Sequence, residues 1–236
     1  MRLHPPDRPT GPLPSPARHW LRRAAACLLA ALTLTSAMSV AWDRDRMSQA
    51  AQRTGPRAVA AVKALQPLLA EGPGRDEQAL LAAINDFFNR RVVFTDDRAA
   101  WGQDDHWASP LETLEKGMGD CEDYAIAKYF SLLAAGVPVA KLRLVYVRAA
   151  IGGPGGISQA HMVLAWYAQP GAEPLILDNL IGEVRPASRR PDLTPVFSFN
   201  SEGLWQGTAG ASAGDPVSRL SRWREIIAKA RGEGFQ

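Results

Sequence analysis

The order of local patterns along this 236-residue sequence predicts an α+β fold, with helices in the first half and an antiparallel sheet in the second. Apolar residues recur at helical spacing between residues 76 and 90. Two β-type runs, at 142–148 and 160–167, are separated by a glycine-rich stretch that is typical of a hairpin loop. No internal repeat is visible. About 195 residues follow the N-terminal leader, enough for one domain with a sizeable core.

The first 41 residues have the pattern of a secretory signal peptide. Basic residues precede an apolar run at 24–34, and the small residues Ser39, Val40 and Ala41 form a cleavage site. The apolar stretch is close to the length that spans a bilayer, so an uncleaved anchor is the alternative. Cys27 lies inside this stretch and would leave with it, which makes Cys121 the one cysteine of the mature chain.

The basic character of the whole sequence resides in this leader. Residues 1–41 hold 5 of the 27 Lys and Arg residues but only 1 of the 24 Asp and Glu residues. The rest of the chain therefore has 22 basic and 23 acidic residues. The mature chain is therefore close to neutral. Because it has no basic stripe with interleaved aromatic residues, we expect no nucleic-acid partner.

Four elements are predicted ahead of Cys121. Residues 56–69 form a weaker helix, and residues 76–90 form a helix whose apolar face is Leu80, Leu81, Ile84, Phe87 and Phe88. Residues 92–107 contain four aspartates and two tryptophans without a clear period. We expect an ordered loop with solvated acids there, a metal site being the alternative. Ser109-Pro110-Leu111-Glu112 is a capping box that starts a short helix.

Cys121 is placed at the start of the next helix. Asp120 precedes it as an acidic N-cap, the helix extends to about Ala135, and Gly136 and Pro138 end it. The first-turn N–H groups and the helix dipole stabilise a thiolate at this position. The residue type and its place therefore point to a nucleophile, although a lone cysteine can also be a small buried apolar residue.

The second half of the chain carries the strands and a tail. After the two long β-type runs, a short strand at 175–177 ends at Asp178. We divide the chain into the leader (1–41), a catalytic domain (42–205) and a tail (206–236) that is Gly/Ala-rich and then helical. The basic terminal helix presents Leu220, Trp223, Ile226 and Ile227 on one face, which docks on the core or on a partner.

His161 and Asp178 are the candidate partners of the thiol. His161 lies in a strand with Val163 and Ala165 on its own face and Met162 and Leu164 on the other. If this strand lies beside the thiol helix, His161 can take the Cys121 proton and Asp178 can orient the imidazole. A structural histidine is the alternative. His106, in the acidic loop, is a second candidate base without an evident carboxylate of its own.

The carboxylates around the thiol are the candidate metal ligands. Asp120, Glu122 and Asp123 flank Cys121 and should oppose thiolate formation unless a cation neutralises them. Oxygen ligands suit calcium better than zinc. N-capping and pairing with the helix dipole explain the same acids without a metal, and the residues alone leave both interpretations open.

Five blocks of the sequence together resemble the bacterial transglutaminase-like cysteine proteinases, and among them the LapG-type periplasmic proteases. The similarity extends from about residue 86 to residue 205. The blocks are Trp107-Ala108-Ser109-Pro110-Leu111-Glu112, Gly119-Asp120-Cys121-Glu122-Asp123-Tyr124-Ala125, Ala160-His161-Met162-Val163-Leu164, Leu177-Asp178-Asn179-Leu180 and Phe199-Asn200.

The resemblance implies a papain-like, transglutaminase-like core in which the nucleophile helix packs on an antiparallel sheet. It implies Cys121 as nucleophile, His161 as general base and acid, and Asp178 as orienting residue. It also implies a calcium cofactor, with Asp120 and Glu122 as ligands and Asp123 as a further candidate.

The resemblance further implies a biological setting. Members of the family are periplasmic, and they cleave a large cell-surface adhesin near its N-terminus, beside a pair of alanines, which releases cells from a biofilm. An inner-membrane receptor that senses cyclic di-GMP sequesters the protease. Two other functions remain alternatives: an acyl transferase, in which an amine resolves the thioester, and a non-catalytic periplasmic binding module.

Overall fold

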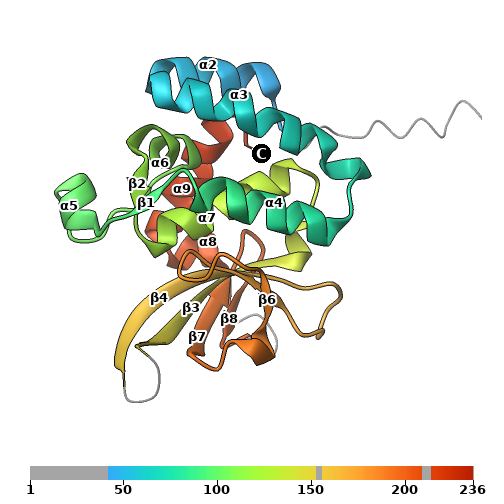
Figure 1. The fold of residues 1–236 in the computed structure, drawn as a ribbon, viewed down its shortest axis with the longest axis vertical. Helices are drawn as coiled ribbons and strands as arrows, with labels where there is room; N and C mark the ends of the chain where they lie inside the picture. The colour runs from blue at the N-terminus through green and yellow to red at the C-terminus, as the bar shows by residue number, and fades with distance from the viewer. Residues whose placement is uncertain (1–41, 153–155, 209–213, 236) are drawn as a thin grey trace, which may run out of the picture. The chain divides into compact units, whose positions relative to one another are not determined.

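The computed structural model describes residues 42–152, 156–208 and 214–235 (Figure 1). The predicted signal peptide lies outside these residues, as do the centre of the glycine-rich hairpin loop and part of the Gly/Ala-rich stretch. Within the described ranges, no helix is both long enough and apolar enough to cross a membrane.

Helices form a layer on one face of the sheet (Figure 1). The predicted helices at 56–69 and 76–90 are present as α3 (Pro56–Glu71) and α4 (Glu77–Asn89). The Asp76 carboxylate starts α4 by accepting the Ala79 N–H at 2.9 Å. A further helix, α2 (Arg44–Thr54), was not predicted, because its buried face consists mainly of alanines beside Met47. It packs on α3, which is followed by the 3₁₀ turn η1 (Gly72–Gly74).

The acidic segment is more regular than we expected. It contains strand β1 (Val93–Phe94) and the short helix α5 (Asp97–Trp101), so the prediction of an ordered loop missed two elements of regular secondary structure. The Asp96 side chain caps this helix by accepting the Ala99 N–H at 3.1 Å, and Gly102 ends it at φ 69°. A helix of one turn is too short to produce a hydrophobic period, which explains why the sequence did not reveal it.

The capping box is confirmed. The Ser109 N–H donates to the Glu112 carboxylate at 2.8 Å, and the Glu112 N–H donates to the Ser109 hydroxyl at 3.3 Å. This box starts α6 (Pro110–Lys116), and Gly117, at φ 63°, ends it. Strand β2 (Met118–Gly119) follows and pairs with β1 in parallel. The β1–β2 ribbon therefore leads directly to Cys121.

Helix α7 (Cys121–Ala134) is the central helix of the domain, and it packs against β4, α4 and α6. Asp120 occupies its N-cap position, as expected, but the Asp120 side chain makes no capping hydrogen bond. Capping therefore does not account for this carboxylate.

The sheet contains six antiparallel strands in the order β6-β5-β4-β3-β7-β8. The strands are β3 (Leu142–Ile151), β4 (Ile157–Trp166), β5 (Leu175–Leu177), β6 (Arg185–Pro186), β7 (Leu193–Phe199) and β8 (Leu204–Gln206), with 3₁₀ turns η2 (Val139–Lys141) and η3 (Ala187–Arg189). The predicted alternation in β4 is confirmed. Met162 and Leu164 belong to the main core under the helices, whereas Val163 and Ala165 belong to a smaller cluster on the opposite face.

The C-terminal segment packs on the main core. It forms α8 (Pro216–Arg219) and α9 (Ser221–Gly232). Trp223 on α9 is fully buried, and its ring contacts Tyr129, Phe130 and Phe199 with centroids 5.3 to 5.5 Å apart. The apolar face predicted for this helix is thus covered by the domain itself.

Candidate active site

Cys121 and His161 line the same small cavity, of about 160 Å³. Cys121 enters it from the first turn of α7, and His161 enters it from the middle of β4. The cavity is also lined by Phe94, Asp96, Asp120, Glu122, Tyr146, Gln159 and Ala160. Cys121 and His161 are 40 positions apart in the sequence, and they line one cavity because α7 packs directly on β4.

Asp178 holds the imidazole of His161. His161 Nε2 and Asp178 Oδ1 are 2.8 Å apart, and both residues are buried. The same carboxylate oxygen accepts the Leu180 N–H at 3.1 Å. Burial alone would raise the pKa of Asp178, but the hydrogen bond and charge of His161, with the contributions of Leu180 and Arg190, lower it to about 2. Since Nε2 is engaged, Nδ1 is the ring nitrogen left for another partner.

Arg190 and Asn89 contact Asp178, and neither was predicted from the sequence. Arg190, which is 3% exposed, forms an ion pair with the other Asp178 oxygen at 2.8 Å and a second ion pair with Asp192 at 2.7 Å. The Asn89 side chain donates to the Asp178 backbone carbonyl at 2.8 Å. Neither residue lies in a recognisable motif, and each reaches Asp178 only through the tertiary fold.

Replacing Arg190 by glutamine should lower kcat about tenfold and leave KM nearly unchanged, because the Asp178 carboxylate loses a buried charge partner that orients it. The pKa of Asp178 should rise, so that the acid limb of the pH profile moves to higher pH.

Arg190→Lys should restore part of the activity if the charge is what matters. The matched control is Arg189→Gln, an exposed neighbour. A proportional loss at every pH, with no shift of the acid limb, would show that Arg190 acts only on stability.

The thiol is surrounded by negative charge. The Cys121 thiol donates to Glu122 Oε2 at 2.6 Å. Burial raises the pKa of Cys121, and the charges of Glu122 and Asp120 raise it further, whereas the backbone N–H of Met162 acts in the opposite direction. Burial and these charges therefore favour the protonated thiol over the thiolate.

Asp97, Asp120 and Asp123 form a second, adjoining cluster. One carboxylate oxygen of each residue lies within 4.8 Å of the others. Asp97 Oδ1, Asp120 Oδ1 and Asp123 Oδ2 are buried and have no hydrogen-bond partner among the described residues. Asp97 was predicted to be solvated with the rest of the acidic segment, and this prediction was wrong, because helix α5 turns it inward to 5% exposure.

The pKa values show how unfavourable the cluster is without a cation. Burial raises the pKa of Asp120 to about 9, with added contributions from the charges of Glu122, Asp123 and Asp97. Burial also raises the pKa of Asp123 to about 7, although the Ala108 N–H partly opposes this. Several hard oxygen donors with unsatisfied lone pairs are what a calcium ion requires, so the residues fit such an ion.

His106 is not brought to the thiol. Its backbone N–H donates to Asp97, and its ring lies against Trp101 with centroids 4.4 Å apart. It is not among the residues that line the cavity of Cys121. Of the two histidines considered as bases, the geometry therefore favours His161.

A cysteine at a helix start that shares a cavity with a buried histidine–aspartate pair is typical of thiol enzymes with a papain-like or transglutaminase-like fold. The chain belongs to the family of bacterial transglutaminase-like cysteine proteinases (BTLCP), which its residues 68–192 match. It is a cysteine protease with a transglutaminase-like fold.

Solved structures of LapG from Legionella pneumophila are similar to this chain. The calcium-bound structure has a TM-score of 0.68 and 37% sequence identity, and the alignment covers 79% of this chain and 98% of LapG. The EGTA-treated structure has a TM-score of 0.69 and 37% identity, with coverage of 79% and 97%. A comparison with curated proteins gives no match.

Proposed function

We propose that this chain is a periplasmic, calcium-dependent cysteine endopeptidase that cleaves the N-terminal region of a large cell-surface adhesin. The observation that carries the proposal is the cavity shared by Cys121 and His161, with Asp178 holding the imidazole at 2.8 Å. The family match and the likeness to LapG support the protease activity, whereas the adhesin substrate, the location and the role in biofilm release are what the resemblance to the LapG-type proteases implies.

The proposed reaction passes through a thioester. His161 Nδ1 accepts the Cys121 proton while the sulfur attacks the scissile carbonyl carbon. The imidazolium then gives this proton to the leaving amine as the carbon–nitrogen bond breaks. Water, deprotonated by His161, hydrolyses the thioester and regenerates the thiol. The backbone N–H of Cys121, in the first turn of α7, is a suitable donor to the oxyanion. Asp178 keeps the ring oriented and stabilises its charged form.

Asp97, Asp120 and Asp123 are the residues that we propose hold calcium, with Glu122 as a further ligand from the thiol side. When bound, the ion supplies positive charge beside carboxylates that otherwise oppose ionisation of Cys121. Three buried oxygens without partners support this assignment, and the calcium-bound and EGTA-treated forms of LapG support the choice of metal. Sequestration by an inner-membrane cyclic di-GMP receptor is the regulation that we propose.

The test is an incubation of the chain from Trp42 onward with the N-terminal region of the host's largest repeat adhesin. Parallel reactions contain calcium, EGTA, or calcium with a labelled amine. We expect a single cut that requires calcium and no incorporation of the amine. Incorporation without cutting would replace the protease with an acyl transferase. Stable association of the chain with the adhesin fragment, without cutting or amine incorporation, would indicate a non-catalytic binding module.

A further inference from the structure

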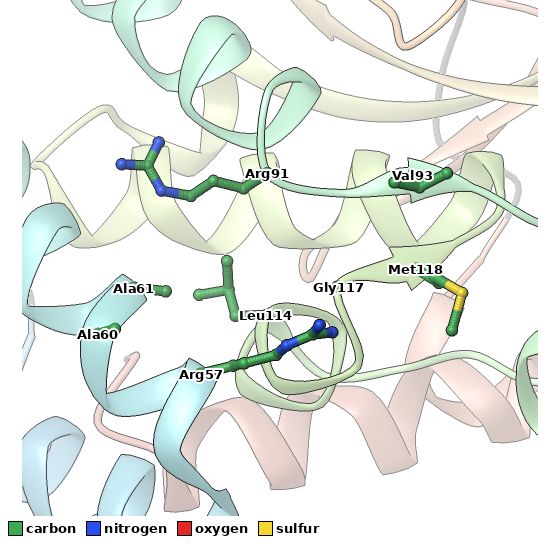
Figure 2. Close-up of a pocket in the computed structure, with 8 residues that line it drawn as sticks. All are labelled: Arg57, Ala60, Ala61, Arg91, Val93, Leu114, Gly117 and Met118. Carbon is green, nitrogen blue, oxygen red and sulfur yellow. The ribbon is translucent and has the colours of Figure 1, made fainter.

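A second cavity, of about 660 Å³, lies beside the β1–β2 ribbon, which contributes Val93 and Met118 to its lining (Figure 2). We call it the arginine groove. It is lined by Arg57, Ala60, Ala61, Arg91, Val93, Leu114, Gly117 and Met118. Its floor is apolar, and Figure 2 shows Arg57 and Arg91 on opposite sides of Leu114.

The two arginines carry charge that the described residues do not neutralise. Arg57 donates to the Lys116 carbonyl at 3.1 Å, and Arg91 donates to the Phe87 carbonyl at 3.3 Å while lying over the Phe87 ring. Neither guanidinium forms an ion pair within residues 42–152, 156–208 and 214–235. Each therefore keeps N–H donors for an external carboxylate.

The groove and the cavity of Cys121 are lined by consecutive residues of β1. Val93 lines the groove and Phe94 lines the thiol cavity, and the two residues are 64% and 52% exposed. The Val93 N–H donates to the carbonyl of Gly117, just before β2, and the Thr95 N–H donates to the carbonyl of Gly119 on β2. The backbone N–H and C=O of Phe94 consequently point to the other edge of β1, which pairs with no strand in the described residues. An extended chain can add a strand there.

Charge also determines which part of a substrate fits each end. The groove attracts acidic side chains through Arg57 and Arg91, whereas the thiol end of the ribbon carries the cluster of Asp97, Asp120 and Asp123 that we propose holds calcium. Met118 and Cys121 are three residues apart, about 10 Å along an extended backbone. Acidic side chains in the groove would therefore lie about three to five residues from the scissile bond.

We propose that the arginine groove is a recognition site for an acidic, extended segment of the protein substrate, which runs along the free edge of β1 into the thiol cavity. This inference rests on the proposed endopeptidase function and names a further specificity determinant for it. The groove raises affinity and sets the register of the substrate, and it takes no part in bond cleavage.

The test measures binding separately from cleavage. Fluorescent peptides of about twelve residues carry a central Ala-Ala pair, with a pair of Asp residues on the N-terminal or the C-terminal side, or Asn in their place. Anisotropy with Cys121→Ala protein, at constant calcium and low salt, gives the dissociation constants. One Asp peptide should bind about tenfold more tightly than its Asn counterpart, and Arg57→Gln with Arg91→Gln should abolish the difference. The control is Arg224→Gln, an exposed arginine on α9.

Equal binding of the Asp and Asn peptides, or discrimination that survives in the double variant, would overturn the recognition site. Cleavage of the Asn peptide by the wild-type chain is scored in parallel. Its absence would count against the endopeptidase, whereas the binding comparison would still decide the groove.

Discussion

Replacing Cys121 by alanine should lower the rate of peptide cleavage at least about 10⁴-fold, because no other group in the proposed mechanism can form the thioester. Thermal unfolding should change little, since the substitution removes one partly buried sulfur atom. The measurement is kcat/KM on the adhesin fragment, with the melting temperature of each variant determined beside it.

Two further variants make this test specific. His161→Ala should have a comparable effect, and the double variant should be no slower than either single variant, because residues that act as one unit are not additive. His106→Gln is the matched control, since this histidine lies outside the cavity of Cys121, and it should retain activity. A folded Cys121→Ala protein that still cuts the adhesin would refute the mechanism.

Removing calcium should abolish cleavage and make the fold sensitive to pH. Burial and the neighbouring carboxylates raise the pKa of Asp120 in the folded, metal-free chain from the ordinary 3.8 to about 9. Between these values the folded chain holds a proton that the unfolded chain has lost, so stability falls as pH rises through this window. Calcium should therefore raise the melting temperature more at pH 8 than at pH 5.

The buried amine of Lys128 has the opposite effect on the pH dependence of stability above neutral pH. Burial lowers the pKa of Lys128 to about 7, so the folded chain loses this proton before the unfolded chain, and stability rises with pH between that value and 10.5. For this reason the comparison is made between variants at each pH. In Asp120→Asn the metal-free melting temperature at pH 8 should exceed that of the wild type, and the calcium-induced shift should be lost.

Asp104→Asn is the matched control for the calcium experiment. Asp104 lies in the same acidic segment, but its side chain is 78% exposed and pairs with Arg98. The wild type and Asp104→Asn should respond to calcium alike. If Asp120→Asn also kept the full response, the ion would have to bind elsewhere.

Several parts of the fold could be predicted because short-range interactions determine them. The capping box at Ser109 and Glu112 involves residues three apart, and the alternation of His161 with Met162 follows from the geometry of any strand. The end of β5 at Asp178 is equally local. From these elements the sequence predicted a histidine and an aspartate on neighbouring strands, and the structure places them in contact.

The sequence by itself determined the order of the elements, the place of Cys121 at a helix start and the residue types around it. Only the tertiary structure decided which distant groups meet. Asp97 lies in one cluster with Asp120, and Arg190 forms an ion pair with Asp178. Arg57 and Arg91 line the same groove. The physical reason is that a side chain carries no local signal of a partner that approaches it across the fold, because burial and charge pairing arise only when helices and sheet pack together.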